Sequence, residues 1–185
     1  MNTKLCTFRY LSIIIDAMDA QKCNIPHLAE RLKSWESAGS RRLDSQFVGT
    51  IVHGVGTHMY MFDEQLKKDG DLNDSILWAT IVAELERRKL HNIPAPQVLY
   101  LQGDNAKDNK HKALFTFCEL LVRLKIFEKV KFSFLPVGHT HEDIDACFGA
   151  GSHMLHRNCA FTVDEVASLW KKGWPSTKTF RYVKV

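Results

Sequence analysis

The spacing of apolar residues along the chain predicts five strands. Three apolar segments of strand length come first, and a glycine-containing turn joins the second to the third; these segments are residues 10–15, 47–53 and 58–62. Residues 98–101 form a continuous apolar run, which is typical of a strand covered on both faces. In residues 130–134 apolar and polar positions alternate, which is the period of a strand.

Three other segments have the spacing of amphipathic helices. Two of them, residues 72–90 and 110–125, carry an apolar stripe that we expect in the core. The stripes are Leu77, Ile81 and Leu85 in the first and Leu114, Phe117, Leu121 and Leu124 in the second. A capping box from Thr162 to Glu165 starts the last helix, which we expect to end near Lys172.

This order of elements predicts an α/β fold with a mixed five-stranded sheet flanked by helices. Three strands with antiparallel connections come first, and the later strands are parallel because a helix crosses between them. The order is that of the ribonuclease H-like fold. We expect a single domain in residues 1–185, with its core at about residues 10–172. The tail, residues 173–185, either adds a strand or is loosely held.

Acidic residues follow the predicted strands at the edge where open α/β sheets carry their sites. Asp16 ends the first strand and Asp104 follows the fourth, and this topology places those two strands side by side. A plain turn acid is the alternative reading of each. A third acid comes after the fifth strand, where the sequence offers three candidates: Glu142, Asp143 and Asp145.

Helix periodicity separates these three candidates. A helix that begins near Thr140 turns about 100° per residue, so the three acids do not all face one ion. Phe148 lies three residues beyond Asp145, on nearly the same face, and a buried Phe148 would turn Asp145 toward the end of the sheet. We therefore favour Asp145, with Glu142 second. We expect Asp143 to cap the helix or to face solvent.

Composition limits the class of protein. The chain has 185 residues, of which 45% are apolar and 25% are charged, as in a globular protein. A net charge of +4 allows a polyanionic partner without requiring one. The five cysteines include no CxxC pair, no signal peptide opens the chain, and no apolar run reaches the roughly 20 residues of a membrane span. We expect an intracellular protein.

Several short motifs recur at the ends of the predicted strands. They comprise Asp16, Met18 and Asp19; His53 and Gly54; Asp104 and Asn105; Gly138, His139 and Thr140; and Asp145 and Phe148. Together they resemble a eukaryotic family of transposon-associated domains of unknown function, similar to the ribonuclease H-like catalytic core of DDE transposases. The resemblance covers about residues 11–169. Each motif is weak alone, and the combination is specific.

The resemblance implies a DDE/DDD-type transposase or nuclease core that performs metal-dependent phosphoryl transfer on DNA. Two divalent ions about 4 Å apart, Mg²⁺ or Mn²⁺, clamp the attacking and leaving oxygens in such sites. Carboxylates supply the oxygen ligands that these hard cations take. Asp16 would bridge both ions and Asp104 would hold one of them. Asp145, or Glu142 in its place, would hold the other.

Other residues near these acids would support the site or bind DNA. Asn105 would hydrogen-bond the substrate, and His139 or His141 would orient a phosphate or a water. Asp19 would support the carboxylates, or only cap the following turn. Three lysines after Asp104 are candidates for phosphate contacts, with a solvated helix start as the alternative: Lys107, Lys110 and Lys112.

A structural zinc site is a weaker alternative use of the polar residues in the last third of the chain. The residues that suggest it are His139, His141, Cys147, His153, His156 and Cys159. Their spacing fits no standard zinc finger. No base is identifiable beside Cys23 or Cys118 that would make either a nucleophile.

The alternative function is a catalytically inactive ribonuclease H-like module that binds nucleic acid or protein. We expect DNA as the partner, no association with a membrane, and a nuclear location. A homo-oligomer is compatible with this assignment. The family resemblance implies more sequence before the first strand than the roughly ten residues found here. We therefore expect that a DNA-recognition region is missing from this chain, which favours the inactive module, whereas the presence of all three acids favours the enzyme.

Overall fold

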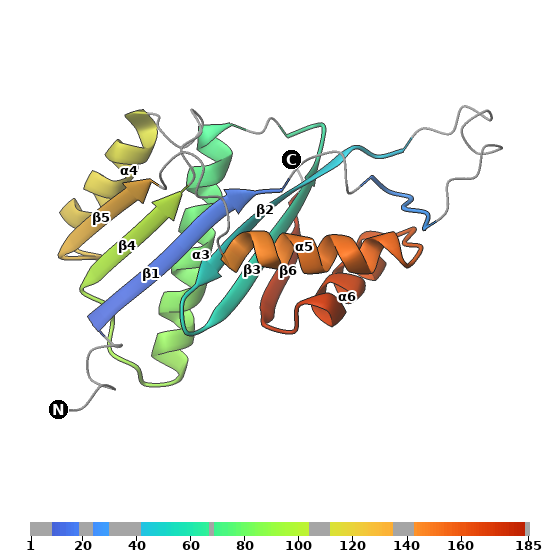
Figure 1. Ribbon diagram of the computed structural model, residues 1–185. Coiled ribbons are helices and arrows are strands. Elements are labelled where there is room, and N and C mark those ends of the chain that lie inside the picture. Colours follow the sequence, from blue (N-terminus) through green and yellow to red (C-terminus); the bar gives the residue numbers. More distant parts are fainter. Residues whose placement is uncertain are drawn as a thin grey trace. The chain divides into compact units, whose positions relative to one another are not determined.

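A computed structural model of the chain describes residues 9–18, 24–29, 42–66, 69–103, 112–134 and 143–183. Six strands form one mixed sheet in the order β5-β4-β1-β2-β3-β6, with helices packed on it (Figure 1). The strands are β1 (Tyr10–Ala17), β2 (Ser45–Val52), β3 (Gly56–Asp63), β4 (Val98–Gly103), β5 (Lys129–Phe134) and β6 (Thr177–Tyr182). The helices are α3 (Gly70–Leu90), α4 (Lys112–Arg123), α5 (Asp143–His156) and α6 (Val163–Gly173).

The direction of the strands confirms the predicted fold class. β4 is parallel to β1 and to β5. Two backbone hydrogen bonds join β1 to β2, from His53 to Ser12 at 3.0 Å and from Met18 to Phe47 at 2.9 Å. From Ser12 to Met18 the residue number rises along β1, whereas the residue number of the bonded partner on β2 falls from 53 to 47. The two strands are therefore antiparallel. Strands β1 to β5 therefore have the order and directions of the ribonuclease H-like fold.

The tail of the chain adds a sixth strand, the first of the two alternatives that the sequence left open. β6 lies parallel to β3, with Met59 opposite Phe180. Two side chains fix it in place. The ring of Phe180 packs against Phe47 with 5.8 Å between ring centroids, and the Tyr182 hydroxyl donates a hydrogen bond to Asp63 Oδ2. The predicted sheet was one strand short because a six-residue basic and aromatic segment carries little strand periodicity of its own.

The described residues fall into two compact units. The first comprises residues within Met1–Asp16, Thr50–Gly56 and Lys68–Thr140, and the second comprises residues within Ala17–Gly49, Thr57–Lys67 and His141–Val185. The expectation of a single domain stays a prediction. None of the helices in the described part of the chain is long and apolar enough to cross a membrane.

In the first unit, apolar residues of β1 and β4 pack with α3 and α4. The buried members include Leu11, Ile13, Leu99, Leu101, Ile76, Leu77, Ile81, Leu114, Leu121 and Phe127. The prediction that Leu124 belongs to this core is wrong, because Leu124 is 61% exposed. Helix α4 ends at Arg123, and the chain then turns through Lys125 with φ of +57°, so the helical period no longer applies at Leu124.

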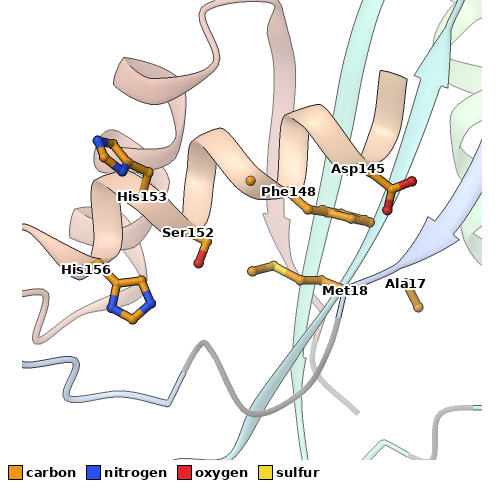
Figure 2. Close-up of a pocket in the computed structure, with 8 residues that line it drawn as sticks. Ala17, Met18, Asp145, Phe148, Ser152, His153 and His156 are labelled. Atoms are coloured by element: carbon orange, nitrogen blue, oxygen red, sulfur yellow. The ribbon is translucent and has the colours of Figure 1, made fainter. Parts of the chain in front are cut away.

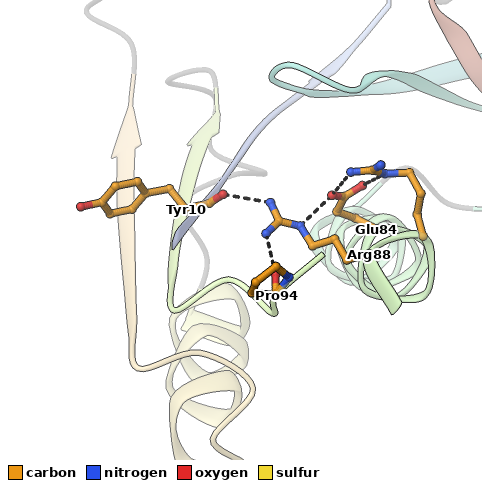
Figure 3. Close-up of polar contacts among 5 residues, drawn as sticks. Tyr10, Glu84, Arg88 and Pro94 are labelled. Atoms are coloured by element: carbon orange, nitrogen blue, oxygen red, sulfur yellow. Dashed lines mark hydrogen bonds and ion pairs between the residues drawn. The ribbon is translucent and has the colours of Figure 1, made fainter. Parts of the chain in front are cut away.

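A buried ion pair on α3 joins the helix to β1 and to the loop that follows the helix. Glu84 accepts hydrogen bonds from Arg87 and Arg88, with Nε–O distances of 2.7 Å and 2.8 Å. Arg88 also donates to the backbone carbonyl oxygens of Pro94 at 3.2 Å and Tyr10 at 3.0 Å (Figure 3). The side chains of Glu84 and Arg88 are 1% and 7% exposed. The apolar stripe on α3 did not indicate that charged residues at these positions are buried.

Two opposing effects act on the pKa of Glu84. Burial raises it, because a carboxylate loses its hydration, while hydrogen bonds and positive charge from Arg87 and Arg88 lower it. The arginines prevail, and the pKa lies below the ordinary value. The ion pair therefore stabilises the fold above the unfolded-state pKa, and this stabilisation is lost as the pH falls through the lowered folded-state value.

We predict that Arg88→Ala lowers the free energy of unfolding by about 3 kcal/mol, because it removes the buried partner of Glu84 and leaves the carbonyl oxygens of Tyr10 and Pro94 without their donor. Arg87→Ala is the matched control. Its side chain is 35% exposed, so the loss should be below about 1 kcal/mol. Urea unfolding at neutral pH measures both. Equal losses would show that Arg88 contributes no more than a surface arginine.

In the second unit, Trp170 of α6 lies at the centre of an aromatic cluster. Its ring is fully buried and stacks on Phe47, with centroids 5.1 Å apart and an angle of 16° between the rings. Phe148 of α5 meets the same ring at 6.5 Å. The predicted capping box of α6 is confirmed, with Thr162 and Glu165 hydrogen-bonding each other's backbone. Gly151 allows α5 to approach α6, because a Cβ there would lie 2.6 Å from the Trp170 ring.

We predict that Gly151→Ala destabilises the chain by about 1–3 kcal/mol, because the added methyl overlaps the rigid indole. Gly149→Ala is the control in the same helix, since a Cβ there meets nothing within 4 Å. Its effect should be neutral or stabilising by up to about 1 kcal/mol, the usual gain of alanine over glycine in a helix. Thermal unfolding of the two variants checks this, and a destabilised Gly149→Ala would contradict it.

Candidate functional site

The first part of the candidate site is the carboxyl end of β1 and β4. These parallel neighbours are in register from Tyr10 opposite Val98 to Ile15 opposite Gly103. Asp16 is the next residue of β1 and is half-buried. In the sequence, Asp104 directly follows Gly103 and lies outside the described residues. The predicted pairing of the two strands is therefore present, and the sharing of an ion by the two carboxylates stays a prediction.

The second part is a cavity of about 550 Å³ that runs along one face of α5. Figure 2 shows the side chains that line it. The lining residues are Ala17, Met18, Asp145, Phe148, Gly149, Ser152, His153 and His156. Asp145 lies at the end near Ala17 and Met18, and the histidines lie at the other end of the helix (Figure 2).

The phase of α5 puts Asp145 on the cavity. Phe148 is 7% exposed and packs over β2, where a Cβ on Gly49 would lie 3.0 Å from its ring. Asp145, one turn earlier, is half-buried on the same face, whereas Asp143 is exposed. The exposure of Asp143 and the burial of Phe148 agree with the helical phase expected from the sequence. The role of Asp145 as a ligand stays a prediction.

Met18 fixes the end of β1 at this cavity. Its side chain is 4% exposed, and its backbone N–H donates to the Phe47 carbonyl oxygen at 2.9 Å. Ala17 and Met18 directly follow Asp16 in the sequence. The two residues that follow Asp16, the first expected acid, and Asp145, the expected third acid, therefore line the same cavity.

Most of the other expected site residues lie outside the described part of the chain. These are Asp19, Asn105, Lys107, Lys110, His139, His141 and Glu142. Lys112 is described, and it is an exposed first residue of α4. Within the described ranges no group of three or more histidine, cysteine, aspartate or glutamate side chains could hold a metal ion. The metal ligand set therefore stays a prediction.

The buried environment of Cys147 disfavours its use as a zinc ligand. The thiol is fully buried beside Trp170 and Thr57, and burial raises its pKa to about 11. It is therefore a neutral thiol near pH 7, whereas zinc binds the thiolate. Cys159 is exposed.

In comparison with protein families, residues 35–184 match a domain of unknown function, DUF7869. The chain belongs to the DUF7869 family. The expectation of a domain family of unknown function is thus confirmed. The matched segment includes Asp104 and Asp145, whereas Asp16 precedes it. No curated protein matches the sequence.

The solved structures that are similar to this DUF7869 chain include two complexes of Mos1. The Mos1 strand transfer complex shares 13% sequence identity and a TM-score of 0.47, over 92% of this chain and 48% of that one. The Mos1 mariner paired end complex with Mn shares 9% identity and a TM-score of 0.38, over 90% and 54%. The chain thus spans about half the length of each.

Sequence reasoning missed the cavity role of three residues of this DUF7869 domain. Ser152, His153 and His156 line the cavity, and the sequence suggested the two histidines only as weak zinc candidates. A usable signal was present. Positions 145, 149, 152 and 156 recur at intervals of four, three and four, which is one face of a helix, and that face carries polar groups at both ends.

Proposed function

We propose that this chain is a metal-dependent phosphoryl transferase that cleaves DNA, with Asp16, Asp104 and Asp145 as its catalytic carboxylates. The observation that carries the proposal is the β1–β4 register. Ile15 is opposite Gly103, and the next residues in the two strands' sequences are Asp16 and Asp104. Two acids 88 positions apart in the chain follow paired residues of parallel neighbours, which is where open α/β sheets bind their ligands.

The cavity on α5 supports the choice of the third acid. Asp145 lines it together with Ala17 and Met18, which directly follow Asp16. A DNA strand whose scissile phosphate reached this cavity would meet a carboxylate at its rim. Ser152 and the histidines farther along α5 are hydrogen-bonding groups suited to the rest of a polar ligand.

The donor set fits Mg²⁺ or Mn²⁺, because carboxylate oxygens are hard ligands. Two such ions would stabilise the charge on the attacking and leaving oxygens of the phosphodiester. The chain's own part is to hold Asp16, Asp104 and Asp145 in place. Met18 does this for the backbone after Asp16 by its bond to β2, and the buried Phe148 does it for Asp145.

The remaining partners follow from the same proposal. A DNA substrate implies a nuclear location, and Lys112, exposed at the start of α4, is available to a phosphate. A homo-oligomer and a separate DNA-recognition region stay predictions of the family resemblance.

Asp104→Asn tests the proposal because it keeps the shape of the side chain and removes its charge. We expect wild-type chain to cut plasmid DNA with Mg²⁺ or Mn²⁺, and the variant to be slower by more than about 100-fold. Ca²⁺ should bind without supporting cleavage, because its looser coordination misplaces the oxygens. Asp164→Asn, at an exposed position of α6, is the charge-matched control and should cut normally.

Cleavage that persists in a chelator, or in Asp104→Asn, would contradict this mechanism. Metal binding without any cleavage by the wild type would instead support the alternative, a catalytically inactive module that binds nucleic acid or protein.

The third acid is tested by metal affinity. Calorimetric titration of Mn²⁺ into Asp145→Ala should show affinity at least about tenfold weaker than wild type, because one carboxylate ligand is lost. Glu142→Ala is the second candidate, and Asp143→Ala is the control because Asp143 is exposed on the helix. A loss confined to Glu142→Ala would move the role to that residue, and a loss confined to Asp143→Ala would refute the helical phase.

A further inference from the structure

A group of basic side chains lies beside the histidine end of the cavity, away from Asp145. It consists of His27, Arg42 and His156, which we call the basic cluster. Two stretches of backbone pairing assemble it. Ile25 and Leu43 exchange hydrogen bonds of 3.1 Å and 2.7 Å, and His27 and Ala160 exchange bonds of 2.7 Å and 2.8 Å. The segment that carries His27 is thus hydrogen-bonded to Leu43, which follows Arg42, and to Ala160, which lies just after α5.

The two imidazoles of the basic cluster are in contact. The rings of His27 and His156 meet edge to face, with centroids 6.2 Å apart. His156 also lines the cavity, so the basic cluster is continuous with it. The basic cluster and Asp145 are at opposite ends of one helix, eleven residues apart, which corresponds to about 16 Å.

Two nitrogen atoms of the basic cluster lack partners among the described residues. His27 Nε2 and Arg42 Nη2 are buried there without a hydrogen bond. The other ring nitrogen of His27 is used, because the imidazole bonds to the backbone of Leu155. Asp44, the acid nearest to Arg42 in the sequence, is exposed and accepts a bond from Asn24 at 2.8 Å. Arg42 Nη2 is a donor, and His27 Nε2 becomes one when the ring is protonated, so the basic cluster is suited to a ligand that supplies acceptors and negative charge.

Electrostatics favour an anion as that ligand. Burial lowers the pKa of His27, and the positive charges of His156 and Arg42 lower it further, although the bond to Leu155 opposes them. The Arg42 guanidinium disfavours a metal cation here, because it is always charged and repels other positive charge. An anion with several oxygens would relieve the repulsion and accept from all three side chains, and arginine in particular presents a fork of donors to phosphate.

We propose that the basic cluster binds a backbone phosphate of the nucleic-acid strand that extends along α5 from the cleavage site at Asp145. This inference rests on the proposed function and adds the path of its substrate. Adjacent phosphates of a duplex strand rise about 3.4 Å along the axis, so 16 Å corresponds to about five nucleotides. Ser152 lies between the two ends and is available to an intervening phosphate.

The test is the affinity of labelled DNA duplexes, measured by fluorescence anisotropy in Ca²⁺ so that no cleavage occurs. Arg42→Gln and His156→Asn should each weaken binding about tenfold, and Arg42→Gln should reduce the slope of log affinity against log salt by about 1. Arg181→Gln, an exposed arginine of β6 in the same unit, is the control and should change affinity less than about twofold. The effect of Arg42→Gln should vanish for duplexes that extend fewer than about five nucleotides past the cleavage site on this side.

The two proposals fail in different ways. If both variants bind DNA as the wild type does while Asp104→Asn abolishes cleavage, the phosphate site is wrong and the proposed function stands. If the wild type neither binds nor cuts DNA, titration with inorganic phosphate decides whether an anion site exists. If phosphate shifts the His27 and His156 ring signals in NMR spectra of the wild type but not of Arg42→Gln, the anion site exists. Nucleic acid would then be ruled out as its ligand. If Arg42→Gln unfolds, His156→Asn carries the test, because His156 is exposed at the end of α5.

Discussion

The parallel pairing of β1 with β4 is the constraint on which the candidate site depends. Strand β1 carries Leu11, Ile13 and Ile15, which are nearly inaccessible, and a shift of one residue in register would turn this apolar row to the opposite face of the sheet. The same register that buries these residues sets Ile15 opposite Gly103. The position of Asp16 relative to the end of β4 is therefore fixed by the packing of residues that have no chemical role.

The Glu84–Arg88 pair illustrates what the apolar pattern predicts and what it does not. The length of α3 follows from the stripe of Leu77 and Ile81, and the structure extends the predicted helix by only two residues at its start. Burial of Glu84 and Arg88 does not follow from that stripe, because a charged pair spaced four apart on a helix is usually solvated. Only the carbonyl oxygens of Tyr10 and Pro94, brought in by the tertiary fold, make the buried position of Arg88 favourable.

Prediction of the site was similarly uneven, for physical reasons. Strand ends are short-range features, so Asp16 and the strand that precedes Asp104 could be located from β-branched runs and turn residues. The face of α5 could be assigned because a buried Phe148 fixes the rotation of the helix around Asp145. The basic cluster could not be found in this way. His27, Arg42 and His156 are brought together by isolated backbone bridges, and no local period relates them.

The distribution of charge on α5 has an ordinary structural explanation that the cavity makes insufficient. Asp143 and Asp145 lie in its first turn and His153 and His156 in its last, which is the arrangement favoured by the helix dipole. That effect is worth about 0.3–1 kcal/mol for each exposed charge, and it depends only on distance from the helix end. It does not distinguish exposed Asp143 from Asp145, or explain why the Arg42 guanidinium also lies near the carboxyl end. A cation near His156 disfavours a positive charge on that ring, and this reduces the gain from the dipole. An anionic ligand would turn this cost into binding energy, which is the physical reason for our proposal that a nucleic-acid strand extends along α5 between its two ends.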